Sequence, residues 1–561
     1  MINDWDPSEG IEATDELMDI ITCNDSVAVL AGAGAGKTEL LAQKASYLFV
    51  TDRCVWPKRI LSLTFKTEAQ ININERVSKR CGVKANRFDS FTFHAFCKSI
   101  VDRFKNTLDE IDRPNNNYDI VFKRGEAVDN TKILMDDLFV LALKILKSND
   151  KIRKMFSSSY CFVFVDEFQD TTNSQYELLQ VLFHNTDTKL LTVGDINQSI
   201  MLWAGARKTV FSDYLKDFKA TNKFLIKNYR ASKEIQDVLG VLLNYINDSK
   251  FLPAELAATS SSCSVNHFTD EYQESIVITE SIKELIASGV SESDICILTK
   301  ELSSQYTEIL RAELIKSGVR CLDMSDLQDA LKEPLGQIFS LFIKALVSPT
   351  PKVMTELFSI NLALNKVEIG DEKEEELTFN LAQFISLKAS LIKNETSINE
   401  LISYVRNFII YLGISKIKGR WKQYKSHAYY TLIWNTLEVH MRNMCVQADS
   451  LECASRLFNA DNAVQIMNVH KCKGLEYHAV YFVGLEDQAF WKYKAEPFEN
   501  NCAIYVALSR AKEKLFVTYT DSREHRVKFG YDNRASSHSH VRGILNTLLK
   551  KCKFSLVKHI I

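Results

Sequence analysis

Short apolar runs rich in β-branched residues alternate along the chain with longer segments of helical periodicity. This order is typical of parallel α/β sheets, in which each strand is followed by a helix that crosses back over the sheet. The predicted strands fall into two groups, the first at 27–30, 60–65, 162–165 and 190–193, and the second at 223–226, 295–298, 464–469, 480–483 and 515–519.

Two long segments interrupt this alternation. Residues 97–160 and 350–460 are mostly helical by pattern, because apolar residues recur there at three- and four-residue intervals. We therefore expect two α/β domains, each carrying a mostly helical insertion. The predicted division is 1–96 with 161–221 for the first domain and 97–160 for its insertion, then 222–349 with 461–561 for the second domain and 350–460 for its insertion.

Composition narrows the class of protein. The 561 residues are 46% apolar and 25% charged, and 69 basic against 71 acidic residues give a net charge of −2. A protein coated with positive charge is excluded, so any contact with nucleic acid must use a local basic groove. The 13 cysteines lack the spacing of a metal-ligand set, and no apolar run is long enough to cross a membrane. We expect a reduced, cytoplasmic protein without membrane contact.

A segment of small residues follows the first predicted strand and opens a helix. It reads Ala31-Gly32-Ala33-Gly34-Ala35-Gly36-Lys37-Thr38. Small residues let backbone N–H groups curl around a phosphate, and the helix N-terminus adds a favourable dipole. In such a loop, Lys37 reaches the β- and γ-phosphates and Thr38 is a ligand of Mg²⁺. The segment predicts a site for ATP and Mg²⁺, although Ala31 stands where a glycine is usual.

Two carboxylates end a later apolar strand. Residues 162–170 read FVFVDEFQD, which places Asp166 and Glu167 directly after the strand. An ATPase needs one carboxylate near its metal ion and another near the attacking water. We assign the first role to Asp166 and the second to Glu167.

Further segments, taken in chain order, resemble the motifs of superfamily 1A helicases of the UvrD/Rep/PcrA type. They are 63–69 (LTFKTEA) with Arg76, 92–97 (TFHAFC), 193–200 (VGDINQSI) with 203–206 (WAGA), 228–232 (NYRAS), 464–477 (VQIMNVHKCKGLEY) and 505–512 (YVALSRAK). The resemblance covers nearly the whole chain. It implies two RecA-like P-loop NTPase domains in tandem, with ATP between them.

The resemblance also implies roles for individual residues of the nucleotide site. Gln198 would sense the γ-phosphate, while Arg230 and Arg510 would act as arginine fingers from the second domain, since a guanidinium suits phosphoryl oxygens. Tyr229 would stack on adenine, and Gly474 and Glu476 would contact the nucleotide, Glu476 at the ribose. The chain departs from the family pattern at two positions expected near the adenine base. Glu39 stands where an arginine is often found, and the glutamine that reads adenine has no clear counterpart.

Four residues would face single-stranded DNA by the same resemblance. Flat rings can stack on a base without reading its identity, and the ring-bearing residues at matching positions are Phe65, His94, Trp203 and His470. For Phe65 and His470, a place in the core is the alternative. His470 would also link its loop to Gln198.

Two basic segments carry further hypotheses. Residues 416–425 (KIKGRWKQYK) interleave cations with aromatics, which favours either a contact with duplex DNA at a single-strand/double-strand junction or a solvated loop. The C-terminal region from Arg523 onward is also basic, with Lys550, Lys551 and Lys553. It would be a partner contact or a charged helix end.

The function that the resemblance implies is ATP-dependent 3′-to-5′ DNA unwinding or translocation on single-stranded DNA, in repair, recombination or antiphage defence. The size also resembles that of short UvrD-like proteins encoded beside an ATPase–nuclease in Gabija-type antiphage systems, which implies a nuclease-type partner. A translocase that does not unwind, a subunit of such a complex, and a non-catalytic DNA-binding scaffold remain alternatives.

Overall fold

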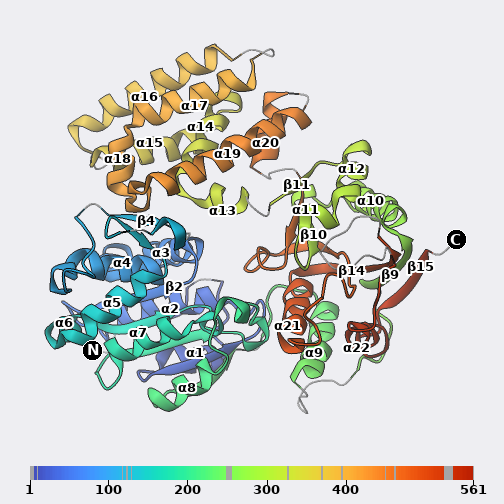
Figure 1. Cartoon of the computed structure of the whole chain (residues 1–561), viewed down its shortest axis with the longest axis horizontal. Coiled ribbons are helices and arrows are strands. Elements are labelled where there is room, and N and C mark those ends of the chain that lie inside the picture. The colour runs from blue at the N-terminus through green and yellow to red at the C-terminus, as the bar shows by residue number, and fades with distance from the viewer. Residues whose placement is uncertain are drawn as a thin grey trace.

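The computed structural model describes most of the chain, and two parallel sheets organise it (Figure 1). The described residues are 5–8, 10–116, 118–121, 124–127, 129–225, 227–247, 255–324, 327–367, 370–392, 396–448, 450–459, 463–523 and 535–559. Among them, no helix is both long and apolar enough to cross a membrane.

The first sheet has six parallel strands, and its two faces are buried by different sets of helices. Ile60 belongs to the cluster on one face, whereas Leu61 and Leu63 belong to the cluster on the other. Alternate residues of one strand therefore point to opposite cores, which is why these strands read as continuous apolar runs. In spatial order the strands are β3 (Phe88–Thr92), β2 (Arg59–Thr64), β6 (Tyr160–Val165), β7 (Lys189–Gly194), β1 (Val27–Ala31) and β8 (Thr221–Leu225).

Helices from both ends of the first domain cover this sheet. One face packs against the first three helices, and the other against the last two together with the insertion, whose residues share one hydrophobic cluster with the sheet. The domain helices are α1 (Asp15–Thr22), α2 (Lys37–Val50), α3 (Thr67–Cys81), α7 (Asn173–Phe183) and α8 (Val210–Asp217). The insertion holds α4 (Phe93–Phe104), β4 (Asp119–Val121), β5 (Lys132–Leu134), α5 (Asp137–Ser148) and α6 (Asp150–Ser159).

One predicted strand was assigned to the wrong sheet. The run at 223–226 was expected to open the second domain, but β8 pairs in parallel with β1 of the first sheet, where Val27 lies opposite Thr221. A local apolar pattern predicts a strand but does not contain the identity of its neighbour. Ile226 lies outside the described residues.

The second sheet has seven parallel strands, again with cores on both faces. In spatial order these are β11 (Cys321–Asp323), β12 (Val464–Asn468), β10 (Ile295–Thr299), β13 (Tyr477–Phe482), β14 (Ala511–Ser522), β9 (Cys263–Asp270) and β15 (Ser555–His559). The helices packed around it are α9 (Lys233–Asn247), α10 (Glu271–Ala287), α11 (Ser303–Tyr306), α12 (Glu308–Lys316), α21 (Pro497–Leu508) and α22 (Arg542–Asn546).

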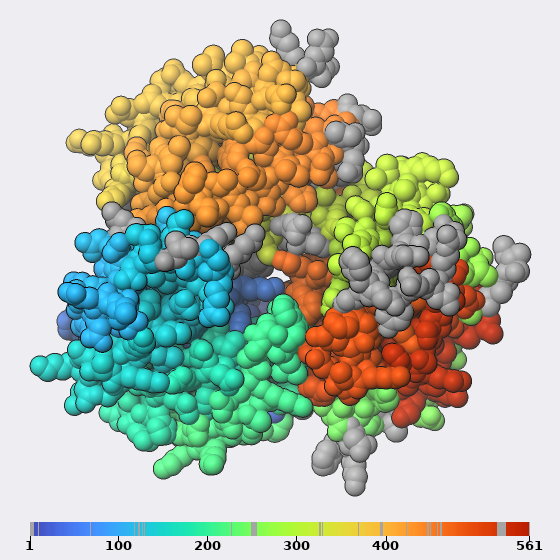
Figure 2. Space-filling view, in the orientation of Figure 1, coloured from blue at the N-terminus to red at the C-terminus, as the bar shows by residue number. Residues whose placement is uncertain are grey.

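A helical bundle is inserted between β11 and β12 of the second domain and lies against the insertion of the first domain (Figure 1). It contains the predicted helical segment 350–460, and α14, which precedes residue 350, packs into it against α15 and α16. The helices are α13 (Leu327–Lys332), α14 (Pro334–Val347), α15 (Pro351–Asn365), α16 (Glu372–Ser390), α17 (Ile398–Leu412), α18 (Ile414–Arg420), α19 (His427–Gln447) and α20 (Leu451–Phe458). In the space-filling view, the first domain, the second domain and the bundle surround a central hollow (Figure 2).

Candidate nucleotide site and nucleic-acid interface

The small-residue loop lies between β1 and α2, at the carboxyl edge of the first sheet. Gly34 and Gly36 adopt φ values of +71° and +80°, which a residue with a side chain rarely tolerates. A Cβ atom on Gly34 would lie 2.3 Å from the Asn228 side-chain oxygen. The Tyr229 N–H donates to the Gly34 carbonyl at 3.1 Å. The loop is thus curled as a phosphate loop requires, with the 228–230 segment packed directly on it.

The two predicted carboxylates meet this loop because β6 ends at the same edge of the sheet. Thr38 Oγ1 lies 3.5 Å from Asp166 Oδ2, so two hard oxygen ligands stand together, as Mg²⁺ prefers. Glu167 has a φ of +50° and its side chain accepts a hydrogen bond from Gln169 at 2.7 Å. This uncommon backbone conformation turns Glu167 away from the line of the strand.

Charges around the carboxylates separate their protonation behaviour. Burial and repulsion from Glu167 raise the pKa of Asp166, and the charge of Lys37 opposes that rise. Burial also acts to raise the pKa of Glu167, but the charges of Lys473, Lys37 and Arg510, together with the hydrogen bond from Gln169, outweigh it and hold that pKa well below its usual range. Glu167 is therefore the carboxylate that remains ionised most readily.

Two arginines close the site from the other side. Arg510 is buried and donates from Nη2 to Gln198 Oε1 at 3.3 Å. Arg230 Nε lies 2.6 Å from Glu476 Oε2, while its buried Nη1 has no hydrogen-bond partner among the described residues. Burial and the charge of Arg510 lower the pKa of Arg230. An unpartnered cationic donor in this position fits an anionic ligand such as a polyphosphate.

The predicted base and ribose contacts lie at the rim of the cleft. Tyr229 is 53% exposed, and the Lys227 ammonium lies 5.1 Å from the centre of its ring. Gly474 has a φ of +91°. Glu476 is paired with Arg230 and, at 3.0 Å, with Lys512. The roles of Tyr229, Gly474 and Glu476 toward a nucleotide stay predictions.

The departure at Glu39 has a local cause. Its carboxylate pairs with Arg76 at 2.7 Å and with Arg80 at 2.6 Å, both from α3. Glu39 is thus part of an ion-pair network that joins α2 to α3. An arginine at this position would face two other cations.

The four predicted DNA-contacting rings form two groups. Trp203 is 63% exposed, and its ring centre lies 5.9 Å from that of His470. Phe65 packs edge-on against Phe93, and the ring of His94 packs against Phe139. Burial, followed by the charges of Lys300 and other lysines, lowers the pKa of His470 to about 4. The ring of His470 is therefore neutral at physiological pH.

A pocket of about 350 Å³ opens beside Trp203 and His470. Lys300, Trp491 and Lys492 of the second domain also line it. The backbone N–H of Trp203 donates to the Glu499 side chain at 3.4 Å, which ties the pocket wall of the first domain to α21 of the second. Aromatic faces with nearby cations are the surface that a nucleobase and its phosphate require.

Two family models match the chain. Residues 14–128 and 115–219 match the UvrD/REP helicase N-terminal domain, and residues 328–522 match the UvrD-like helicase C-terminal domain. The chain belongs to the UvrD/REP helicase family. Its two parallel sheets are accordingly the tandem RecA-like domains of that family, as the sequence predicted.

Individual UvrD/REP relatives resemble the chain at low identity over most of its length. A probable DNA helicase II homolog of Mycoplasma capricolum is 24% identical over 90% of this chain and 83% of its own. The ATP-dependent DNA helicase PcrA of Staphylococcus aureus is 24% identical over 91% of this chain and 83% of its own. PcrA of Bacillus subtilis is 22% identical over 94% and 85%.

Two residues of this UvrD/REP site escaped the sequence-based assignment. Lys473 is nearly buried, and its Nζ lies 2.5 Å from Asp170, 3.6 Å from Glu167 and 3.4 Å from the Gln198 carbonyl. Asp170 and Lys473 lie 303 residues apart, so no local pattern pairs them. The signal available in the sequence was a lysine and an aspartate inside motifs expected to be buried, since buried charges need partners.

The His470 loop contacts Gln198 through Lys473, whereas His470 was expected to make this contact. Gln198 donates to Asp195 at 2.8 Å and accepts from Arg510, while Lys473 reaches its carbonyl. His470 itself lies against Trp203 in the pocket. Trp491, which also lines the pocket, was not singled out from the sequence.

Proposed function

We propose that this UvrD/REP-family chain hydrolyses ATP and uses the energy to move 3′ to 5′ along single-stranded DNA. The observation that carries the proposal is the cleft between the two RecA-like domains. Lys37, Asp166 and Gln198 stand on one side, and Arg230 and Arg510 on the other, with Arg510 hydrogen-bonded to Gln198 across the cleft. A site assembled from two domains responds to any change in their separation.

Each residue has a distinct task in the proposed hydrolysis. Lys37 and the backbone N–H groups of residues 31–36 bind the phosphates, and Thr38 and Asp166 would hold Mg²⁺. When bound, Mg²⁺ neutralises charge on the phosphate oxygens. Glu167, held by Gln169, accepts a proton from the attacking water.

The charge that develops on the γ-phosphoryl group is met by the second domain. Arg230 and Arg510 stabilise it, and Gln198 positions the water through an amide that donates and accepts at once. Once phosphate leaves, both guanidinium groups lose an anionic partner. The cleft then opens more easily, which links hydrolysis to domain motion.

The strand of DNA would pass the pocket next to this cleft. Trp203 lies in the loop that follows Gln198, and His470 lies in the loop that contains Lys473. Each of these two loops would therefore contact both the nucleotide site and the DNA. A base stacked on Trp203 gains about 1–3 kcal/mol without its identity being read. Such contact suits a motor that must advance over any sequence.

A contact with duplex DNA at a junction is supported only in part by segment 416–425. Tyr424 is fully buried and donates to Glu333 at 2.8 Å, so it is a core residue. Arg420 and Lys425 are exposed, whereas the Lys422 side chain lies outside the described residues. The cations can meet phosphates, and any stacking on a base is left to Trp421, which is half-buried with the Arg420 guanidinium carbon 5.7 Å from its ring centre.

Directional translocation is the experiment that tests the proposed function. Oligothymidylates of increasing length, labelled with a fluorophore at the 5′ or the 3′ end, are mixed with protein and ATP in a stopped-flow instrument. Arrival signals that lengthen with oligonucleotide length only for the 5′ label support 3′-to-5′ movement. Equal signals for both ends, or signals that persist in Lys37→Ala, contradict it.

The cysteines bear on the compartment in which the protein acts. All 13 cysteines are free thiols, which fits the reducing cytoplasm. A role in repair, recombination or antiphage defence, and a nuclease-type partner, remain part of the proposal. A forked duplex assayed with the purified chain alone separates unwinding from translocation without unwinding.

A further inference from the structure

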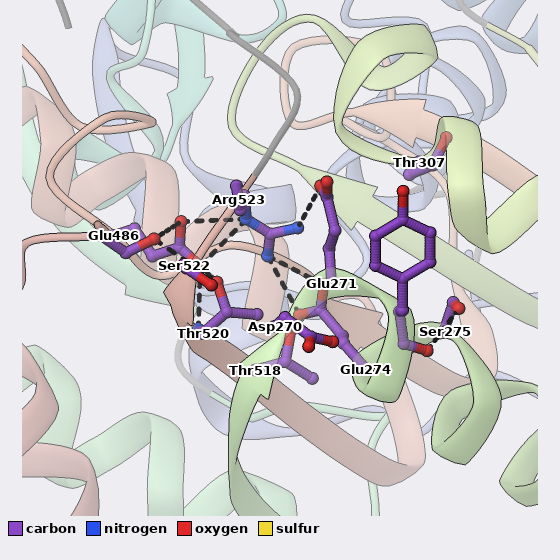
Figure 3. Close-up of polar contacts among 12 residues, drawn as sticks. Asp270, Glu271, Glu274, Ser275, Thr307, Glu486, Thr518, Thr520, Ser522 and Arg523 are labelled. Carbon is purple, nitrogen blue, oxygen red and sulfur yellow. Dashed lines mark hydrogen bonds and ion pairs between the residues drawn. The ribbon is translucent and has the colours of Figure 1, made fainter. Parts of the chain in front are cut away.

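A buried group of charges in the second domain surrounds Arg523 (Figure 3). Arg523 follows β14, and its Nε lies 3.0 Å from Glu486 Oε2, while its Nη2 lies 2.8 Å from Glu274 Oε2. The side chains of Arg523, Glu274 and Glu486 are 5%, 4% and 0% exposed. From its sequence, Arg523 was grouped with a basic C-terminal surface, but the structure places it in the core.

Glu486 occupies the first turn after β13. The Thr520 N–H and hydroxyl both donate to Glu486 Oε1, at 2.9 and 3.0 Å. Before it, Gly484 has a φ of +81°, and a Cβ atom there would lie 3.0 Å from the ring of Tyr306. The chain therefore leaves β13 by a path that only glycine fits, and the Glu486 side chain fixes where it goes next.

The main chain of Glu486 continues the same turn into the pocket. Its carbonyl accepts the N–H groups of Ala489 and Phe490, both at 3.1 Å. Ala489, Trp491 and Lys492, which follow within six residues of Glu486, line the same pocket as Trp203 and His470. The Lys492 ammonium lies 5.0 Å from the centre of the Trp491 ring. One short turn thus connects the buried arginine to the pocket wall.

The charge of Arg523 can fix the orientation of the Glu486 turn, which apolar packing alone cannot do. Apolar packing is non-directional, whereas a guanidinium held closely by Glu274 and Glu486 from different elements, with Glu271 at 3.9 Å as a third carboxylate, fixes orientation. Burying charges is costly unless they are paired, so the buried arrangement is favoured when Arg523 keeps its close contacts with Glu274 and Glu486. The ring of Tyr306 adds a cation–π contact 5.3 Å from the guanidinium carbon.

We propose that Arg523 is a positioning residue for single-stranded DNA, which through Glu486 holds Trp491 and Lys492 against the strand. This inference rests on the proposed function. Trp491 stacks on a base and Lys492 meets a phosphate, while Arg523 touches neither DNA nor ATP. The concentration of DNA needed for stimulation therefore depends on Arg523, and the chemistry at the nucleotide does not.

Steady-state ATP hydrolysis titrated with oligothymidylate separates these effects. Arg523→Met is expected to raise the half-saturating DNA concentration about tenfold, with the rate at saturating DNA changed less than about twofold and the KM for ATP unchanged. Trp491→Ala is expected to raise the same concentration about tenfold. The double variant is expected to equal Trp491→Ala, because one effect passes through the other.

Two further variants keep the test decisive if Arg523→Met fails to fold. Glu486→Gln keeps the acceptor for Thr520 but removes the charge facing Arg523, and it is expected to give the same shift. Arg320→Met breaks a partly exposed pair of the same domain, Arg320 with Glu292 at 3.2 Å, and is the matched control without a shift.

The outcomes distinguish this inference from the proposed function. A wild type that DNA does not stimulate contradicts the proposed function itself. A stimulated wild type whose DNA dependence is unchanged in Arg523→Met and Glu486→Gln overturns the positioning role alone. Additive shifts in the double variant also overturn it, because they would mean that Arg523 acts independently of Trp491.

Discussion

The buried pair between Lys473 and Asp170 offers the sharpest test of how the two domains are held together. The perturbation is Lys473→Met, which keeps the length of the side chain and removes its charge. Asp170 is 5% exposed, and its Oδ1 has no hydrogen-bond partner among the described residues, so Lys473 is its principal compensation. Burial, with repulsion from Glu167, raises the pKa of Asp170, and Lys473 opposes that rise without cancelling it.

The size of the effect follows from where the two partners lie. Breaking a buried pair by removing one partner costs about 3–5 kcal/mol. Here Asp170 belongs to the first domain and Lys473 to the second, so Asp170 can recover its hydration when the cleft opens. The variant therefore raises the free energy of the closed cleft, whereas the free energy of unfolding of each domain changes little. A penalty of about 3 kcal/mol lowers the closed population about a hundredfold.

The assay compares turnover with stability in the same variants. We expect Lys473→Met to lower the DNA-stimulated kcat about a hundredfold with little change in the unfolding midpoints. Lys473→Met with Asp170→Asn removes the unpaired charge and is expected to recover part of the lost rate. The reasoning is refuted if Lys473→Met retains the wild-type kcat, or if the loss appears only as a lower unfolding temperature.

Three further predictions concern the same cleft and pocket. Gly34→Ala places a Cβ atom 2.3 Å from the Asn228 side-chain oxygen at a positive φ, so calorimetry should show loss of ATP binding; wild-type affinity would contradict the loop geometry. Arg510→Lys loses the fork that faces Gln198, and we expect kcat to fall about a thousandfold or more while ATP binding persists. A small loss of kcat would remove Arg510 from the catalytic set. Because burial and nearby lysines lower the pKa of His470 to about 4, the ring stays neutral and ionises only as pH falls toward that value. Oligothymidylate affinity should show no His470-dependent change from about pH 5.5 to 8, so His470→Gln and wild type should have parallel pH profiles by fluorescence anisotropy.

Local motifs were predictable from the sequence because their physics is local. The loop at residues 31–38 needs small residues between a strand and a helix, and Asp166 and Glu167 end an apolar strand. The sequence identifies both without reference to distant residues. The fold class followed from the same alternation of strands and helices.

What escaped prediction depends on contacts between distant parts of the chain. β8 reads as a strand, but only the neighbouring β1 determines that it belongs to the first sheet. Arg523 looks like one cation in a basic tail, and its burial depends on Glu274 and Glu486 reaching it from other elements. Trp491 follows an apolar residue in an irregular turn, so nothing local distinguishes a pocket wall from a core position.

The most direct test of the central claim is the rate of ATP hydrolysis with and without single-stranded DNA, for the wild type and for Lys37→Ala. The claim is that a nucleotide site shared by two domains responds to DNA bound beside it. It predicts strong stimulation of the wild type by DNA and no hydrolysis by the variant under either condition. Hydrolysis that DNA does not change, or that survives in Lys37→Ala, would contradict the claim.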